Sequence, residues 1–203
     1  MTINHEKRLI FIHIPKNAGT SIMKAMGVEN IFIDKTIPEY KEHYRDYWEE
    51  YTKFTVVRDP IDRFISAYKF ARMDESGWFS VTGEEGLEKH HHYDICNSMD
   101  INEYVKYVYD NPKDINRWIV PQSWIISDEN GNMEIDYYIK YENLIEDLKK
   151  INITEIEKLN TSKIDDESLI KLTNKSKKLL SEIYSVDYKN FSFYKASSSF
   201  KYC

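Results

Sequence analysis

Residues 11–26, FIHIPKNAGTSIMKAM, are the stretch that most restricts how this chain can fold. An apolar run over residues 9–14 ends at Pro15, a short turn follows, and an amphipathic pattern begins at Thr20. This order predicts a buried strand, a tight loop and a helix whose first amides lack partners within the helix. Free amides and the positive end of a helix dipole favour an anion. The stretch therefore predicts either a phosphate-binding loop or an ordinary capped strand–helix turn with a surface lysine.

The residues of this loop are the first candidate ligands for a phosphate group. Lysine supplies a point charge, glycine lets the backbone approach a ligand closely, and the remaining residues supply amides and hydroxyls. The candidates are Lys16, Asn17, Ala18, Gly19, Thr20 and Ser21. The loop departs from the Walker A pattern G-x-x-x-x-G-K-[ST], because its lysine precedes the glycine. This departure disfavours an ordinary ATP or GTP site with magnesium.

Composition limits the class of protein. With 203 residues, of which 41% are hydrophobic, the chain fits one domain with a sizeable core, and residues 74–99 suggest an insertion or substrate loop. A net charge of −6 argues against a nucleic-acid partner, so any anionic ligand must be held by a local basic site. No apolar run approaches the roughly 20 residues of a membrane span. Cys96 and Cys203 make no disulfide framework. We expect a cytoplasmic protein with free thiols.

Strands alternate with helices along the chain, which predicts an α/β fold with a mostly parallel central sheet flanked by helices. Strands are expected at residues 9–14, 30–34, 53–57 and 135–141. Helices are expected from residue 20, over 39–51, from residue 60, and over 101–109, 142–150 and 166–184. Ligands of such sheets bind at the carboxyl ends of the strands. Both Lys16 and Arg58 directly follow an expected strand.

The segment FTVVRDPIDRFISAYKF, residues 54–70, supplies a second candidate anion site. Arg58 leaves the strand where a guanidinium can bind a phosphate with two parallel hydrogen bonds. Ser66 follows Asp59 by about two helical turns and can return its hydroxyl toward the same place. The alternative is a plain helix start at Pro60 with an Asp–Arg ion pair.

Both segments resemble motifs of one family. The string P-K-x-x-G-T-S after a strand resembles the 5′-phosphosulfate loop of sulfotransferases that use 3′-phosphoadenosine 5′-phosphosulfate (PAPS). The pattern V-R-[DN]-P-x-[DE]-R-x-x-S-x-Y resembles the 3′-phosphate motif of the same enzymes. It matches here at Val57, Arg58, Asp59, Pro60, Asp62, Arg63, Ser66 and Tyr68. The spelling HIPKNAGTS most resembles the carbohydrate sulfotransferases of family 2, of the heparan and chondroitin type, and their soluble bacterial relatives.

The resemblance implies a P-loop-like sulfotransferase fold, PAPS as co-substrate and no metal. It extends more weakly to residues 136–144, to Pro121-Gln122, to residues 159–162 and to residues 184–191. Ser162 and Lys163 are then either further cofactor contacts or ordinary loop surface. Lys16 is expected to stabilise the leaving group as the sulfuryl group departs.

The acceptor hydroxyl needs a base, and histidine is the side chain whose pKa lies nearest neutrality. His43 is the candidate, because its surroundings resemble the family stretch K-H-x-x-x before the 3′-phosphate strand. The match is imperfect, since Glu42 takes the place of the expected lysine. Glu39 and Glu42 are reserve bases. The alternative for His43 is a partly exposed helical histidine.

The other histidines are not expected to act as the base. His13 is expected to pack beside the loop. The run at residues 90–92 has no accompanying cysteine or spaced carboxylates, which favours a solvated loop over a metal site.

The sequence thus predicts a sulfotransferase that moves a sulfuryl group from PAPS to an acceptor hydroxyl, most simply on a carbohydrate. Aromatic residues at 44–51 and Trp78 either stack on sugars or pack in the core. Arg45, Arg117 and Gln122 are further candidates for acceptor contact. Two alternatives remain: a nucleotide-dependent kinase, and a noncatalytic protein of the same fold that binds nucleotides or sulfated glycans.

Overall fold

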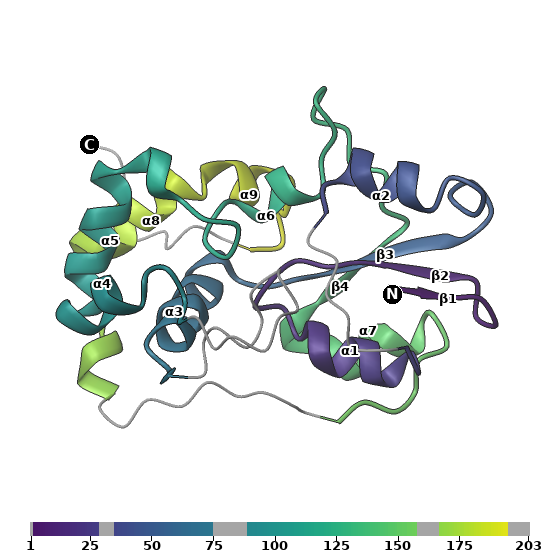
Figure 1. Ribbon diagram of the computed structural model, residues 1–203, viewed down its shortest axis with the longest axis horizontal. Helices are drawn as coiled ribbons and strands as arrows, with labels where there is room; N and C mark the ends of the chain where they lie inside the picture. Colours follow the sequence, from purple (N-terminus) through teal and green to yellow (C-terminus); the bar gives the residue numbers. More distant parts are fainter. Residues whose placement is uncertain (1, 29–34, 75–88, 158–166, 195–203) are drawn as a thin grey trace. The chain divides into compact units, whose positions relative to one another are not determined.

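The computed structural model describes residues 2–28, 35–74, 89–157 and 167–194 (Figure 1). The chain divides into two compact units: Met1–Arg58 with Gln122–Thr161, and Asp59–Pro121 with Ser162–Cys203. We call them the first and the second unit, and the prediction of a single domain stays a prediction. None of the helices in the described ranges is long and apolar enough to cross a membrane.

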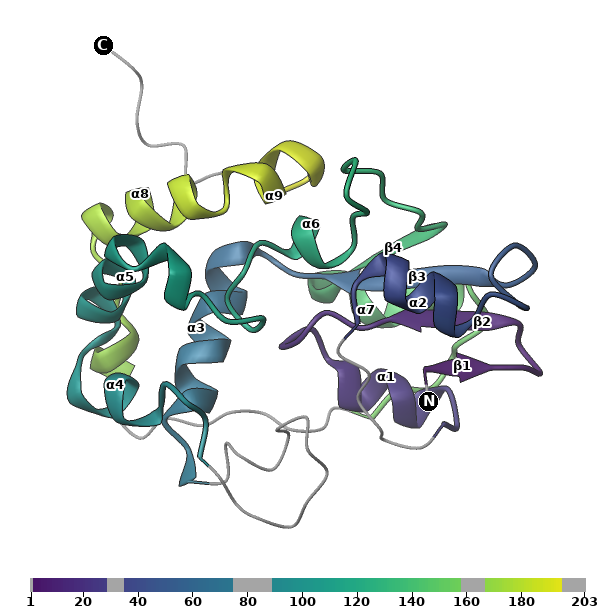
Figure 2. The same ribbon diagram turned by 45° about the horizontal axis from the view of Figure 1, so that its top comes forward.

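The first unit contains a four-stranded sheet in the order β1-β2-β3-β4, which can be followed in Figure 2. The strands are β1 (Ile3–Asn4), β2 (Leu9–Ile12), β3 (Thr52–Val57) and β4 (Tyr137–Lys140). β1 is antiparallel to β2, whereas β2, β3 and β4 are mutually parallel. The predicted α/β class with a mostly parallel sheet is confirmed. The strand predicted at 30–34 lies outside the described residues.

Helices cover both faces of this sheet (Figure 1). Alternate strand residues, such as Phe11, Phe54 and Ile139, pack with α1 (Gly19–Ala25) and α7 (Leu144–Lys149) in one apolar core. α2 (Ile37–His43) covers the opposite face. All four residues of β2 are buried, as a strand enclosed on both faces requires. The unbroken apolar run at residues 9–12 is the sequence signature of that enclosure.

The helix predicted over 39–51 is shorter than expected. α2 begins beside a capping box of Thr36 and Glu39, with a proline in its first turn, and it ends at His43. Residues 44–51 form turns closed by bonds such as Tyr47 N to Tyr44 O, 2.8 Å. Tyr44 and Trp48 are buried, so their four-residue spacing imitated a helical core face although the backbone is turning toward β3.

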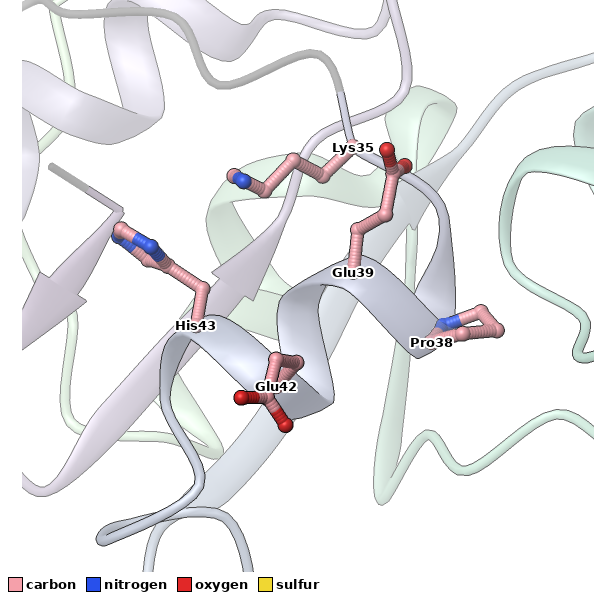
Figure 3. Close-up of a pocket in the computed structure, with 5 residues that line it drawn as sticks. All are labelled: Lys35, Pro38, Glu39, Glu42 and His43. Carbon is pink, nitrogen blue, oxygen red and sulfur yellow. The ribbon is translucent and has the colours of Figure 1, made fainter.

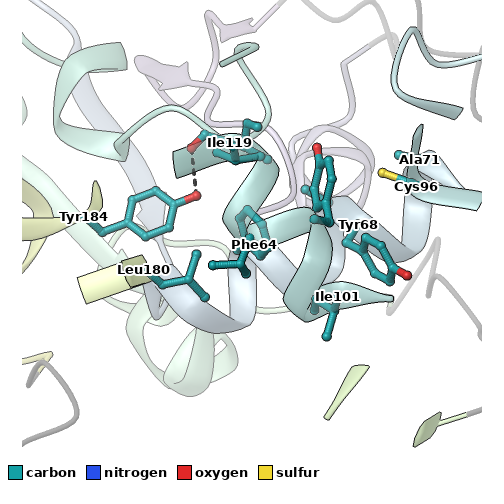
Figure 4. Packing of buried hydrophobic residues seen from close by; sticks show 12 residues of the cluster. Phe64, Tyr68, Ala71, Cys96, Ile101, Ile119, Leu180 and Tyr184 are labelled. Carbon is teal, nitrogen blue, oxygen red and sulfur yellow. Dashed lines mark hydrogen bonds between the residues drawn. The ribbon is translucent and has the colours of Figure 1, made fainter. Parts of the chain in front are cut away.

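The second unit is helical and surrounds its own apolar core (Figure 4). Its main helices are α3 (Pro60–Ala71), α4 (Tyr93–Ser98), α5 (Ile101–Asp110), α8 (Asn174–Ile183) and α9 (Ser185–Asn190). Asp59 caps α3 through the amides of Ile61 and Asp62, and Asp100 forms a capping box at α5. Both helices begin at the predicted residues, 60 and 101.

The single long helix predicted over 166–184 is wrong. A 3₁₀ turn, Glu167–Ile170, precedes α8, and α9 follows it after Tyr184. The Thr173 hydroxyl accepts from the Ser176 amide and starts α8 anew. The side chain of Asn102 holds the intervening backbone, since it contacts the Lys171 carbonyl at 3.0 Å and the Thr173 amide at 2.8 Å. Tertiary bonding from α5 thus interrupts a helical pattern.

His92 corrects the prediction that residues 90–92 form a solvated loop. Its side chain is buried, with Nδ1 2.7 Å from the Tyr104 hydroxyl and Nε2 3.4 Å from the Asp114 carboxylate. Burial lowers the pKa of His92 below its ordinary value, the charge of His91 adds to this, and Asp114 opposes it. The described part of the chain holds no cluster of three or more metal-ligating side chains.

Because of His92, the free energy of unfolding is expected to decrease as the pH is lowered. Its folded pKa lies below the unfolded value near 6.5, so below that pH the unfolded chain binds more protons. The free energy of unfolding should then decrease by at most about 1.4 kcal/mol per pH unit, until the folded pKa is reached. Urea unfolding from pH 7.5 to 5.5 should show a weaker decline in His92→Gln. His5→Gln, which changes an exposed histidine, is the control, and equal slopes in all three proteins would contradict the assignment.

Cys96 is a buried free cysteine in the core of the second unit. Burial raises the pKa of its thiol to about 12. A thiol with so little thiolate is unreactive at neutral pH, so Cys96 is a packing residue. Cys203 lies outside the described residues.

Candidate functional site

The loop between β2 and α1 carries two residues in the left-handed region. Lys16 has a φ of 71° and Ala18 a φ of 61°, although both possess a Cβ. A left-handed residue followed by a helical one turns successive amides toward one side, which makes an anion-binding concavity. Each such residue costs on the order of 1 kcal/mol, and strain of this kind clusters at binding sites. The sequence directed attention to Gly19, which is instead the buried first residue of α1.

Asn17 fastens the loop to the sheet. It is fully buried, and its Nδ2 donates to the carbonyl of Val56 and to Oε1 of Gln122, each at 2.7 Å. Its Oδ1 is buried and meets no hydrogen-bond partner in the described residues. The side chain of Asn17 therefore acts within the protein, and only its backbone amide remains as a candidate anion ligand.

Arg58 follows the last residue of β3 and lies against the same loop. Its Nη1 donates to the carbonyl of Lys16 at 3.2 Å, and its guanidinium carbon lies 4.2 Å from the centroid of the Tyr141 ring. Its buried Nε has no hydrogen-bond partner within the described ranges. The structure thus brings Lys16 and Arg58 together at the carboxyl ends of two adjacent parallel strands.

The turn after β4 supports Tyr141. The buried carboxylate of Asp147 accepts from the Lys140 amide at 3.1 Å, from Asn143 Nδ2 at 3.0 Å and from Lys150 Nζ at 2.7 Å. Burial raises the pKa of Asp147, but these donors outweigh it and hold the pKa below its usual range. A charged, fully bonded anchor therefore fixes the turn on which the Arg58 guanidinium rests.

For the other residues predicted to bind the donor, the structure gives an element or an exposure, or does not describe them. Ser66 is half-buried on α3 of the second unit, whereas Arg58 is the last residue of its stretch of the first unit. Thr20 and Ser21 lie in the first turn of α1. Ser162 and Lys163 lie outside the described residues, as do residues 159–161 and Trp78.

The second arginine of the 54–70 segment is a structural residue. Arg63 is fully buried and donates to the carbonyl of Val120 at 2.7 Å and to that of Arg117 at 3.2 Å. The hydroxyl of Tyr184 donates to the intervening carbonyl of Ile119 at 2.7 Å (Figure 4). Arg63 and Tyr184, which belong to two separate stretches that resemble the family, thus hold the same segment, residues 117–120.

His43 lies in a depression of about 370 Å³ at α2, lined by Lys35, Pro38, Glu39, Glu42 and His43 (Figure 3). The side chains of Lys35 and His43 extend to the same side of the helix. The His43 side chain is exposed and its ring makes an edge contact with Tyr44. Glu39 is held by the helix cap, because its Oε2 accepts from both the amide and the hydroxyl of Thr36 at 2.7 Å.

α2 runs antiparallel to β2. The Tyr40 hydroxyl accepts from the amide of His13, close to the loop end of β2. The Tyr44 hydroxyl accepts from the amide of Thr2, whose carbonyl pairs with Phe11 further back. The first turn of α2, with Glu39, therefore lies nearer to the 15–19 loop than His43 does. His13 is buried beside the loop, as predicted.

Gln122 occupies a place that the sequence did not reveal. It was a candidate for acceptor contact, but it is fully buried and bonds to Arg58 and Asn17. The Pro121-Gln122 pair was the only sequence signal of its importance. Arg45 is exposed beside Glu42, at 3.6 Å, and Arg117 supplies a backbone carbonyl to Arg63.

Comparison with known proteins adds one finding. A family model described as "Sulfotransferase family" matches residues 1–194, which include every described residue of both units. No curated protein and no solved structure matches the chain.

Proposed function

The chain belongs to the sulfotransferase family, and we propose that it transfers a sulfuryl group from PAPS to an acceptor hydroxyl, most simply on a carbohydrate. The proposal includes a P-loop-like donor site at the 15–21 loop and action in the cytoplasm. Its main support is the contact between the Arg58 guanidinium and the Lys16 carbonyl, which brings Arg58 and the backbone of Lys16 together at one end of the sheet. In a chain with a net charge of −6, such a local pair is where a multiply charged nucleotide is best accommodated.

The donor would be held at its two anionic ends. Backbone amides from Asn17 to Ser21 would surround the 5′-phosphosulfate, and the left-handed turn at Ala18 supports this role. Arg58 would bind the 3′-phosphate through its guanidinium, whose Nε has no hydrogen-bond partner in the described residues, together with Ser66. Ser162 and Lys163 are proposed as further contacts. No metal is required, because protein cations neutralise the nucleotide.

Sulfuryl transfer asks for in-line positioning and for stabilisation of the charge that develops. The acceptor oxygen forms a bond to sulfur while the bond from sulfur to the 5′-phosphate oxygen breaks. His43 would take the proton of the hydroxyl, and Lys16 would neutralise the departing phosphate oxygen. The α2 depression is the proposed approach for the acceptor, since it contains His43 as well as the reserve bases Glu39 and Glu42.

Titration calorimetry with 3′-phosphoadenosine 5′-phosphate (PAP), AMP and ATP–magnesium tests the donor assignment. We expect the wild type to bind PAP most tightly. Arg58→Ala should weaken PAP binding roughly 10- to 150-fold, because a charge-assisted hydrogen bond contributes about 1.5–3 kcal/mol. Binding of AMP, which lacks the 3′-phosphate, should change far less.

Arg8→Ala is the matched control, because this exposed arginine precedes the opposite end of β2 and pairs with Glu50. Its PAP affinity should equal that of the wild type. A preference for ATP–magnesium would contradict the proposal and favour a kinase. PAP binding without turnover of PAPS on a panel of hydroxyl acceptors would favour the noncatalytic binding protein.

A further inference from the structure

The side-chain amide of Gln122 bonds to the backbone of Arg58 in both directions. The Arg58 amide donates to Oε1 at 3.0 Å, and Nε2 donates to the Arg58 carbonyl at 2.8 Å. The strand ladder ends one residue earlier, where Val57 pairs with Lys140. Gln122 therefore takes the place of a strand partner for the first residue beyond β3. Buried backbone groups left unpaired would destabilise this conformation, so the amide fixes the point from which the Arg58 side chain extends.

The same amide also holds the loop that carries Lys16. Oε1 of Gln122 accepts from Nδ2 of Asn17 at 2.7 Å, and that Nδ2 also donates to Val56 of β3. One oxygen thus receives a donor from each of the two candidate anion-binding segments. Both Gln122 and Asn17 are completely buried, which excludes water as a competitor for these bonds.

We propose that Gln122 is a positioning residue that sets the spacing between the Lys16 loop and Arg58. This inference rests on the proposed function, in which these two segments bind the two ends of one nucleotide. Gln122 itself does not contact the donor, because its amide is engaged within the protein. The geometry gives it a role different from the acceptor contact suggested by its place in the sequence.

Gln122→Ala removes the bonds to Asn17 and to both backbone groups of Arg58, and it is expected to weaken PAP binding roughly 10-fold, with a smaller effect on AMP. In the Arg58→Ala background the same change should cost little, because the group that Gln122 positions is already missing. Asn4→Ala is the control. It removes a part-buried hydrogen bond of 2.7 Å from the Asn4 side chain to the Met26 carbonyl, elsewhere in the first unit. Its PAP affinity should be unchanged even where its stability is reduced.

Gln122→Glu separates positioning from general loss of stability. At neutral pH the carboxylate keeps the acceptor role but faces the Arg58 carbonyl without a proton, so PAP binding should be weak. As the pH falls, the protonated carboxyl donates again, and PAP affinity relative to wild type should recover. A loss that is constant with pH, or additive losses in the Arg58→Ala cycle, would overturn the inference.

Hydrogen exchange provides a readout that does not need the nucleotide. The Arg58 amide should exchange faster in Gln122→Ala than in wild type or Asn4→Ala, because its acceptor is removed. Wild-type protein that fails to bind PAP would contradict the proposed function, while the exchange result still decides the positioning role. Unchanged exchange at Arg58 would overturn that role whatever the ligand.

Discussion

Replacing Lys16 by methionine is expected to lower kcat for sulfuryl transfer roughly 10²- to 10³-fold, the loss typical when one charge-stabilising donor is removed. The reason is that its ammonium is proposed to meet charge that develops only as the bond from sulfur to the phosphate oxygen breaks. PAP lacks the sulfuryl group, so its affinity should fall much less than the rate. Assays of sulfuryl transfer from PAPS measure kcat, and calorimetry with PAP measures the affinity.

Methionine preserves the length of the side chain and the left-handed backbone already tolerates a Cβ at this position. The bond from Arg58 to the Lys16 carbonyl is also retained, because it involves the backbone. Lys24→Met is the control, since Lys24 is exposed on α1 and pairs with Glu157. Equal losses of PAP affinity and of kcat/KM in Lys16→Met would contradict a transition-state role and indicate simple binding.

His43→Ala is expected to lower kcat roughly 10²- to 10⁴-fold, the range of general base catalysis, with nucleotide affinity unchanged. The exposed side chain makes no contribution to the sheet core, so the free energy of unfolding should change little. His5→Ala replaces another exposed histidine of the first unit, hydrogen-bonded to Tyr51, and should keep full activity.

The direction of α2 makes Glu39→Gln a necessary companion. Glu39 lies one turn closer to the 15–19 loop, and its carboxylate already accepts from Thr36. If His43 is the base, Glu39→Gln should cost only the capping contribution to stability, about 1 kcal/mol. The opposite pattern, with full activity in His43→Ala and a large loss in Glu39→Gln, would transfer the role to Glu39. Glu42→Gln tests the second reserve base in the same assay.

Local chemistry made several elements of the fold predictable. The apolar run before Pro15 marked β2, and the β-branched residues before Arg58 marked β3. Pro60 and the helical spacing of the apolar residues after it marked α3, and the helix predicted from residue 101 is α5. Each signal acts through neighbours within a few residues, so it can be read from one stretch. The helix error at 39–51 arose because the spacing of two buried aromatic residues imitated a helix, and the error at 166–184 arose because the Asn102 side chain interrupts a helical pattern.

The proximity of Lys16 and Arg58 was also predictable, because parallel strands end at a common edge of the sheet. The sequence by itself therefore determined the family, the parallel sheet and the proximity of Lys16 and Arg58. The tertiary structure alone decided how these two residues are held. Asn17 and Gln122 are 105 residues apart in the chain, yet one hydrogen bond joins them. Arg63 likewise binds carbonyls 54 and 57 residues away. Such bonds depend on which polar groups, distant in the chain, are buried beside one another, and no local pattern encodes that.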